Sequence, residues 1–510
     1  MKQGYKRIIG SRLIITFIAV IIQITWLWGL LKFLAPYALL INIVLTMLAI
    51  VFVLYVASKR DEPAYKILWL ICILTFPLFG TILYLGFGDK RTSRPLHRRL
   101  EKVREQLGPL PEDHDTLSAL EAESLRTAQT FAYTSRLCHD YPVCKNISAQ
   151  YFPLGDELFP SMLEALEQAE KYIYIEYFII SVGDMWNTIL DVLERKAAEG
   201  VDVRIIYDDL GSLMTLPPKY SDFLGRKGIK SVSFNPMKLF ISGTLNNRDH
   251  RKILVIDGKI AFSGGINIAD EYINRIVRFG HWKDIGFRIE GPAVYNYLHM
   301  FIEFWNAFSS DPLPVPTQQY AAAEDNYDGY VLPYFDSPAN RDAVSNHLYM
   351  ELLDSATRYA WFFTPYLMLG DTLLDTMVRA AQRGVDVRIF LPGIPDKRVI
   401  YRITQSFYRP LLKAGVHIYI YKPGFLHAKA CLIDDEIGTV GTVNLDYRSL
   451  FLHFECNSLF YKASLLKDLK KDFDETMVQK FDELVADKNF PWKLRDILPK
   501  VLVSGEKAGV

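Results

Sequence analysis

The sequence predicts an α/β protein with two related domains, each a mixed β-sheet flanked by helices, behind an N-terminal α-helical membrane region. Three observations predict this fold class. Long apolar stretches are concentrated in residues 1–90, whereas the remainder alternates strand-like segments with amphipathic helical ones. A polar pattern in residues 249–267 recurs in residues 426–444. Because the pattern recurs among different neighbours, we expect a duplicated fold unit.

The membrane region contains three apolar stretches, at residues 13–33, 38–57 and 67–87, and Pro77 predicts a kink in the last. Each stretch has about the 20 residues that a helix needs to cross a bilayer. Buried core helices and a cleaved signal peptide are weaker interpretations, because the first stretch is too long for a signal peptide and the second follows closely. We expect two to three spans.

Charged residues bias the orientation of these spans. Basic residues precede the first stretch, and a denser basic cluster follows the third. The positive-inside rule places both ends in the cytoplasm, whereas three spans would separate them. One stretch is therefore expected to be re-entrant or interfacial, and the large C-terminal region is expected in the cytoplasm.

A basic helical connector is expected over residues 91–144. Four apolar residues in it fall at helical spacing with basic residues between them: Leu96, Leu100, Val103 and Leu107. The pattern fits a helix lying on an anionic lipid surface, or equally a solvated connecting helix.

A second internal repeat defines the domains. "LERKAAEGVDVRIIYDD" (193–209) is echoed by "VRAAQRGVDVRIFLPG" (378–393), and each predicts a helix that ends at a glycine, Gly200 or Gly384, before a strand. The repeat, with the proline-bearing polar segment between its copies, predicts the domain division. The first domain is placed at residues 145–310, the linker at 311–326 and the second domain at 327–510.

The polar pattern has the spacing His-x-Lys-x4-Asp-x6-Gly-x2-Asn in both copies. The copies are in strict register, because every residue of the second lies 177 positions after its equivalent, as 427 − 250 shows. The first copy comprises His250, Lys252, Asp257, Gly264 and Asn267, and the second comprises His427, Lys429, Asp434, Gly441 and Asn444.

Strand periodicity orients the motif. Side chains two apart on a strand face the same way, so His250 and Lys252 point together, and the equivalent pair of the second copy does the same. Apolar residues follow on both faces, which predicts a buried strand open only at its start. Asp257 begins a hairpin turn, as does Asp434, so these aspartates are expected to fix a turn or a distant partner in preference to chemistry.

The two copies together predict a cationic pocket of two histidines, two lysines and two asparagines. It has no carboxylate cluster for a divalent metal, so we expect no metal and no cofactor. Such a pocket suits a phosphodiester: one neutral imidazole attacks phosphorus, and the other, protonated, donates to the leaving oxygen. The lysines and the asparagines Asn267 and Asn444 would stabilise charge on the phosphate oxygens.

These motifs, with "YDDLGS" (207–212), "GGINIADEY" (264–272) and "GTVNLDYRS" (441–449), resemble the phospholipase D superfamily, and the wider context resembles bacterial cardiolipin synthases. The resemblance covers nearly the whole chain. It implies two phospholipase D-like domains related by a pseudo-twofold axis, and a phosphohistidine intermediate. His250 would be the nucleophile, and His427 the general acid and later the base.

The resemblance also implies supporting carboxylates and a substrate. Asp284 in "HWKD" and Glu455 in "HFECN" would each support the histidine of the other half. The sequence departs from the family pattern at Asp249, where asparagine is usual, and at Lys283, where arginine is usual. The implied reaction moves a phosphatidyl group between two phosphatidylglycerol molecules in a bacterial cell membrane, and yields cardiolipin and glycerol.

Other functions fit the sequence less well. The net charge is 0, with 58 basic and 58 acidic residues, which disfavours a nuclease or any nucleic-acid partner. A non-enzymatic membrane scaffold would predict erosion of one motif, and both are intact. Within the same chemistry, water or another alcohol as acceptor remains an alternative. The five scattered cysteines are expected to be free thiols.

Overall fold

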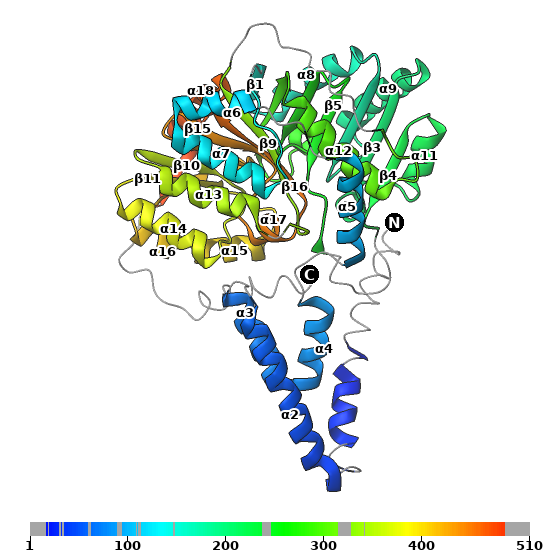
Figure 1. Ribbon diagram of the computed structural model, residues 1–510, viewed down its shortest axis with the longest axis vertical. Coiled ribbons are helices and arrows are strands. Elements are labelled where there is room, and N and C mark those ends of the chain that lie inside the picture. The colour runs from blue at the N-terminus through cyan, green and yellow to red at the C-terminus, as the bar shows by residue number, and fades with distance from the viewer. Residues whose placement is uncertain are drawn as a thin grey trace. The chain divides into compact units, whose positions relative to one another are not determined.

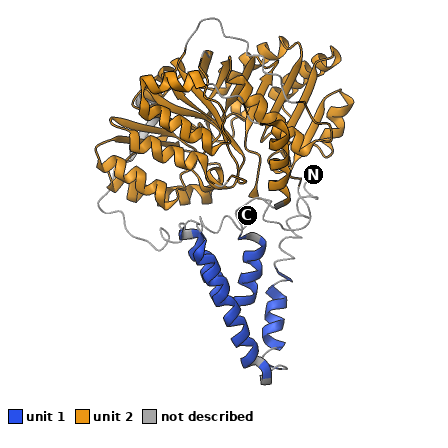
Figure 2. Ribbon diagram, viewed as in Figure 1, with its two compact units in different colours: residues 1–90, 237–245, 500–510 blue, residues 91–236, 246–499 orange. Residues whose placement is uncertain are grey.

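The computed structural model describes residues 17–484 (Figure 1), apart from 19, 30–31, 33–34, 60–62, 89–93, 109, 111–113, 146–147, 237–245, 315–327 and 341. Most of the predicted linker therefore lies outside the described residues. The chain divides into two compact units (Figure 2). The small unit is mainly residues 1–90, and the large unit consists of residues 91–236 and 246–499.

The small unit is helical. Helix α2 (Ala35–Ser58) contains a segment, Leu39–Ser58, that is long and apolar enough to cross a membrane, which agrees with the second predicted span. The first predicted span is described mainly over a shorter apolar helix, Val20–Gly29. The third is two helices, α3 (Pro63–Thr75) and α4 (Pro77–Phe87). Proline lacks a backbone N–H and disfavours the helical conformation before it, so the helix breaks there instead of kinking.

Helices α3 and α4 form a hairpin. The hydroxyl of Tyr65, near the start of α3, donates a 2.8 Å hydrogen bond to the carbonyl of Gly88, just after α4. The rings of Trp69 and Tyr84 meet edge to face, with centroids 5.3 Å apart. Tyr84 also contacts Tyr55 near the end of α2. The end of α2 therefore lies beside the end of the hairpin at which α3 begins and α4 ends.

The large unit begins with α5 (Arg94–Leu107), whose apolar side chains Leu100, Val103 and Leu107 are buried. Helix α5 packs against α12 (Val294–Phe308), and Arg104 forms a 2.8 Å ion pair with Glu303 there. The lipid-surface interpretation of α5 is therefore wrong, because protein covers its apolar face.

Two mixed sheets form the centre of the large unit, which confirms the predicted fold class (Figure 1). The first has seven strands in the order β1 (Ser148–Phe152), β8 (Gly286–Glu290), β6 (Ile260–Gly264), β5 (Lys252–Ile256), β2 (Tyr172–Tyr177), β3 (Asp202–Asp208) and β4 (Lys230–Phe234). The second has eight, in the order β17 (Phe481–Leu484), β12 (His417–Tyr421), β11 (Asp386–Pro392), β10 (Tyr359–Phe363), β14 (Ala430–Ile433), β15 (Ile437–Gly441), β16 (Glu455–Tyr461) and β9 (Tyr330–Asp336).

The duplication is visible in the topology. Strands β2, β3 and β4 run parallel, as do β10, β11 and β12, while the motif strands β5 and β14 run antiparallel to β2 and β10. The predicted helices are α9 (Asp184–Ala198) and α14 (Asp371–Gln382), and each is followed by a glycine with φ of +95°, Gly200 or Gly384. This left-handed conformation favours glycine and confirms both predicted helix ends.

The remaining elements cover the sheets and connect their strands. They are α6 (His114–Glu123), α7 (Leu125–Leu137), α8 (Gly155–Glu167), α10 (Asp209–Ser212), α11 (Tyr220–Arg226), η2 (Asp270–Ile273), α13 (Val344–Ser355), α15 (Arg398–Ser406), α16 (Tyr408–Lys413), α17 (Tyr447–Phe451) and α18 (Ser464–Lys480). Two short strands, β7 (His281–Lys283) and β13 (Gly424–Leu426), pair in parallel between the halves.

Two backbone connections join the halves at the motifs. The N–H of His427, directly after β13, donates a 2.7 Å hydrogen bond to the carbonyl of Lys283. The N–H of His250 donates a 2.8 Å bond to the carbonyl of Phe454 in the other half. Each histidine is thereby fixed next to a segment of the opposite half.

The motif aspartates fix turns at the far ends of the motif strands. Asp257 has a φ of +53°, and its carboxylate accepts the backbone N–H groups of Glu170, Lys171 and Tyr172 at 2.7–2.8 Å. Asp434 accepts three equivalent N–H groups from residues 357–359. The five residues of β5 and the four of β14, about 13–16 Å of chain, separate these turns from the starts of the strands, so the geometry fits the expected turn role.

Replacement of Asp257 by alanine should therefore affect stability and not chemistry. It removes three hydrogen bonds to a charged acceptor, each contributing about 1 kcal/mol or more, so the midpoint of thermal inactivation should fall by several degrees. Turnover at 25 °C by the folded fraction should stay within about twofold of the parent, because the turn is remote from the histidines. The exposed Asp375→Ala is the matched control, and a large loss of turnover without a loss of stability would contradict the turn role.

Candidate active site

Both motif histidines lie at the same edge of their sheets. β5 begins beside the end of β2, where Lys252 pairs with Tyr177, and β14 begins beside the end of β10. The carboxyl ends of parallel strands are the usual position of binding sites in α/β folds. The histidines therefore stand where loops from both halves converge.

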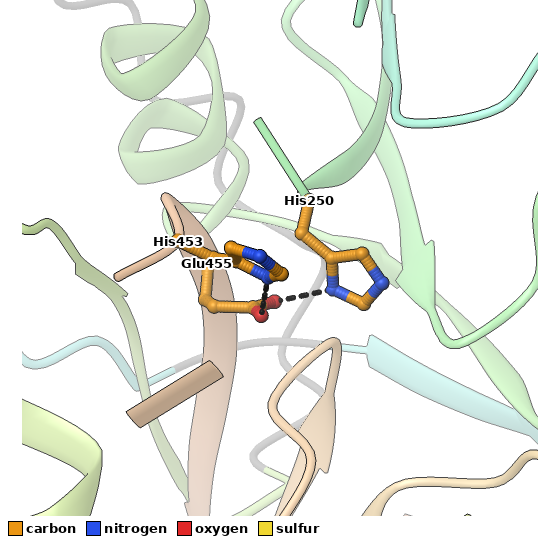
Figure 3. Close-up of side chains that lie close together, drawn as sticks. All are labelled: His250, His453 and Glu455. Atoms are coloured by element: carbon orange, nitrogen blue, oxygen red, sulfur yellow. Dashed lines mark hydrogen bonds and ion pairs between the residues drawn. The ribbon is translucent and has the colours of Figure 1, made fainter. Parts of the chain in front are cut away.

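Each histidine is hydrogen-bonded to a carboxylate of the other half. Nδ1 of His250 lies 2.8 Å from Oε2 of Glu455 (Figure 3), and Nδ1 of His427 lies 2.6 Å from Oδ2 of Asp284. Both carboxylates are fully buried. Each carboxylate orients its ring through Nδ1 and leaves Nε2 for chemistry, and Nδ1 of His427 also lies 2.7 Å from Nζ of Lys429.

The residue after each motif glycine contacts the buried carboxylate of its own site. A Cβ on Gly265 would lie 2.1 Å from Oδ1 of Asp284, so only glycine allows the carboxylate to approach there. The equivalent position in the second half is Thr442, whose hydroxyl donates a 2.5 Å hydrogen bond to Oε2 of Glu455. The two halves thus hold their carboxylates by different means.

The motif lysines are buried and hold the strand starts. Nζ of Lys252 donates a 2.6 Å hydrogen bond to the carbonyl of His250, and Lys429 donates to the carbonyl of His427. Burial lowers the pKa of Lys252 to about 8 and that of Lys429 to about 7. Both ammonium groups therefore titrate close to neutrality.

Burial also controls the charge of the histidines. Burial, and after it the neighbouring lysines, lowers the pKa of His250 and of His427 well below the usual value, which favours neutral imidazoles. The two motifs meet in one site, because each histidine is bonded through its backbone N–H and its Nδ1 to residues of the other half. Burial raises the pKa of Asp284 to about 7.

The asparagines differ from each other. Oδ1 of Asn267 accepts the N–H of Ile179, and its Nδ2 donates to the hydroxyl of Tyr272 at 2.6 Å, so this side chain is already engaged. Oδ1 of Asn444 is buried without a hydrogen-bond partner among the described residues. Phosphate binding by either asparagine stays a prediction, and it would have to come from Nδ2, because an amide oxygen accepts hydrogen bonds and cannot bind a phosphate oxygen.

Three residues of the site escaped the sequence analysis: Thr442, His453 and Lys397. His453 is two residues before Glu455, and its ring centroid lies 5.5 Å from that of His250 (Figure 3). Strand alternation places residues 453 and 455 on one face, which is the signal that could have found it. Burial lowers the pKa of His453 to about 4. Lys397 is a further cation whose charge lowers the pKa of both motif histidines.

A set of potential metal ligands is also present. His250, His453 and Glu455 offer ligand atoms within 4.8 Å of one another. Two histidines and one carboxylate are a donor set that zinc accepts. The buried lysines Lys252 and Lys429 supply positive charge in the same site, which favours an anionic ligand over a cation.

The two departures from the family pattern belong to buried ion pairs. Nζ of Lys283 donates to both oxygens of Asp472 at 2.8 and 2.9 Å, which connects the two halves. Asp249 accepts from Nε of Arg251 at 3.0 Å, and Arg251 also pairs with Glu176. Both side chains are therefore part of the framework behind the histidines.

Comparison with known proteins agrees with this fold. The family model described as "Cardiolipin synthase, PLD-like domain" matches residues 162–303 and 349–477, and one described as "Phospholipase_D-nuclease N-terminal" matches residues 44–88. A cardiolipin synthase of Alkalihalophilus pseudofirmus is 33% identical over 85% of this chain and 86% of its own length. An uncharacterized protein of Streptococcus mutans is 43% identical over 84% of this chain and 93% of its own length.

Among solved structures, a phosphatidylserine synthase of Haemophilus influenzae has a similar fold, with a TM-score of 0.55 at 15% identity over 74% of this chain and 98% of its own. The fold and the paired motifs define a protein of the phospholipase D superfamily. Within it, the chain belongs to the family of cardiolipin synthases with phospholipase D-like domains, and it is a phosphatidyltransferase.

The lysine pKa values predict a descending alkaline limb in the pH profile. Because Lys429 and Lys252 lose their charge as the pH rises through about 7 and about 8, attraction for a phosphodiester anion should weaken, and kcat/KM should fall from neutral pH upward. The measurement is kcat/KM against pH, since this ratio reports the free enzyme. A profile that stays flat up to about pH 9.5 would show that lysine charge is not required.

Proposed function

We propose that this protein is a cardiolipin synthase that transfers a phosphatidyl group from one phosphatidylglycerol to another through a phosphohistidine at His250. The observation that carries the proposal is the crossed arrangement of the two histidines, each with Nδ1 on a buried carboxylate of the other half. A neutral imidazole with Nε2 free is a competent nucleophile. The proposed reaction needs no metal or cofactor.

In the first step, Nε2 of His250 attacks phosphorus of the donor lipid. A nitrogen–phosphorus bond forms, the bond from phosphorus to the glycerol oxygen breaks, and His427 donates a proton to that oxygen. Glycerol leaves. Glu455 accepts the Nδ1–H of His250 and stabilises the positive charge that develops on the ring.

In the second step, the same groups work in reverse. His427, now neutral, removes the proton from the hydroxyl of a second phosphatidylglycerol, whose oxygen attacks phosphorus. The nitrogen–phosphorus bond breaks, His250 returns to its neutral form, and cardiolipin leaves. Each proton that His427 gives in the first step is regained in the second, so the cycle is balanced.

His427 needs the negative charge of the bound substrate in order to become protonated. Burial lowers the pKa of this ring and favours its neutral form, whereas the first step needs it protonated. A bound phosphodiester supplies a negative charge that raises the pKa of the ring. Asp284, whose pKa of about 7 reflects its burial, stands 2.6 Å away and shares the proton. Lys252 and Lys429 neutralise the phosphate oxygens in the same position.

The helices of the small unit support a topology with one hairpin. Helix α2 is long enough to span the bilayer, while α3 has 13 residues and α4 has 11, about 20 and 17 Å, and both are too short. We propose two crossings, one by the apolar stretch 13–33, which is long enough in sequence and lies partly outside the described residues, and one by α2, followed by a re-entrant α3–α4 hairpin. This arrangement places both basic clusters in the cytoplasm together with the catalytic residues.

The proposed reaction is tested by its products. Full-length protein reconstituted with phosphatidylglycerol should form cardiolipin with one glycerol released per cardiolipin, as measured by lipid chromatography and a glycerol assay. His250→Ala and His427→Ala should each lose about a thousandfold or more of this activity, because neither step proceeds without both rings. His417→Ala, on an exposed position of β12, is the matched control. Phosphatidic acid in place of cardiolipin would make water the acceptor.

The hairpin is tested by labelling single cysteines in a background that lacks Cys72. A membrane-impermeant maleimide should modify Ser58→Cys and Lys90→Cys from the same side of sealed vesicles, because a hairpin returns the chain to the side it left. Modification from opposite sides would show that α3 and α4 together cross the bilayer.

A further inference from the structure

Seven large apolar side chains of the large unit are exposed on loops and on the short helices α10 and α15 at the sheet edge that holds the motif histidines. Their exposed fractions range from 40% at Leu210 to 81% at Val277. Single exposed apolar residues are ordinary, whereas a group around one polar pocket marks a surface that binds something. We call this group the rim: Val182, Leu210, Met214, Ile276, Val277, Ile394 and Val399.

The rim lies at the sheet edge that holds the histidines. Val182 follows β2, Leu210 and Met214 follow β3, and Ile394 and Val399 follow β11, so each comes after the carboxyl end of a parallel strand. His250 and His427 precede strands that run antiparallel to β2 and β10, and therefore stand at that same edge. The loop with Ile276 and Val277 follows β6, which ends at this edge as well.

The rim loops contact one another. The N–H of Val182 donates to the carbonyl of Thr215, beside Met214. The guanidinium of Arg275 lies 3.8 Å from the carboxylate of Asp184, which joins the loop after β6 to the start of α9.

The same loop also reaches the other half. A Cβ on Gly280 would lie 3.1 Å from Cδ1 of Ile394, so the loop after β6 approaches the loop after β11 closely. The N–H of Ile394 donates to the carbonyl of Gly424, three residues before His427. The rim is therefore continuous across both halves and reaches the segment that carries His427.

The charged side chains among these apolar residues are mainly basic. The basic ones are Arg275, Arg278, Lys397, Arg398 and Arg402, all exposed, against the acidic Asp184, Asp209, Glu271 and Asp396. Three of the basic residues pair with Asp184, Glu271 and Asp396, and Arg398 and Arg402 add positive charge on α15. Helix α15 shows the pattern locally, because Ile400 and Ile403 are buried while Arg398, Val399 and Arg402 face out. Apolar residues interleaved with arginine and lysine are typical of surfaces that lie in the interface of an anionic bilayer.

We propose that the rim inserts into the headgroup layer of an anionic phospholipid bilayer and so opens the histidine pocket directly onto lipid headgroups. The inference rests on the proposed function, whose donor and acceptor both reside in a bilayer. It adds that the membrane helices of the small unit are not sufficient for activity on lipid in a bilayer. The large unit must also dock through the rim, because histidines surrounded by water would require each lipid to leave the membrane. The basic side chains make a bilayer the favoured occupant over an apolar protein surface.

The kinetic test compares two presentations of one substrate. Full-length protein is reconstituted in vesicles that contain phosphatidylglycerol, or in phosphatidylcholine vesicles with a short-chain phosphatidylglycerol dissolved as monomers. Ile276→Asp and Val277→Asp together should lower activity on bilayer substrate about tenfold or more and leave activity on the monomeric substrate within about twofold. Leu125→Asp, 60% exposed on α7, is the matched control and should change neither.

The possible outcomes distinguish the docking role of the rim from the proposed reaction. Full bilayer activity in the double variant, or equal losses on both substrates, would overturn the docking role. A wild-type protein that makes no cardiolipin from either substrate would count against the proposed function instead, and a second measurement then decides on the rim. A nitroxide attached at Val277→Cys should report burial among lipids on phosphatidylglycerol vesicles, while one at Leu125→Cys should stay in water. An aqueous Val277 signal would refute the insertion.

Discussion

The rest of the structure depends on two hydrogen bonds that cross between the halves, from His250 to Glu455 and from His427 to Asp284. Neither half holds its own histidine in place, because the carboxylate that orients each ring belongs to the other half. The backbone connections at Phe454 and Lys283 place each carboxylate within reach of its partner. The tight association of the two sheets is therefore a requirement of the chemistry as well as of the core.

Burial of charged groups in this site costs desolvation free energy, and the lowered pKa values limit that free-energy cost. Burial favours the neutral form of the two histidines and brings the pKa values of the lysines near neutrality, so the site carries less positive charge than its composition suggests. A phosphodiester anion restores the charged forms on binding. The substrate thus completes the electrostatics of the site, and the same anion prepares His427 to donate a proton.

Much of the fold and site could be predicted because the signals were local. The motif strands, the turns at Asp257 and Asp434 and the glycines after α9 and α14 follow from periodicity and left-handed conformations, which neighbouring residues determine. The burial of the α5 face against α12 could not be predicted, since periodicity shows that a face is apolar and not what covers it. Thr442 and His453 were missed because their contacts with Glu455 and His250 depend on how distant segments meet. Pro77 predicted a kink, whereas the helix ends at Thr75 and a new helix begins at Pro77.

The most direct test of the account is to identify the atom that receives the phosphatidyl group. Wild-type protein turning over phosphatidylglycerol would be quenched with denaturant at alkaline pH, digested, and analysed by mass spectrometry for a peptide with a phosphatidyl adduct. The account predicts the adduct on His250, stable in alkali and labile in acid as a nitrogen–phosphorus bond requires. An adduct on His427, or turnover with none on either histidine, would contradict the proposed roles of the crossed pairs.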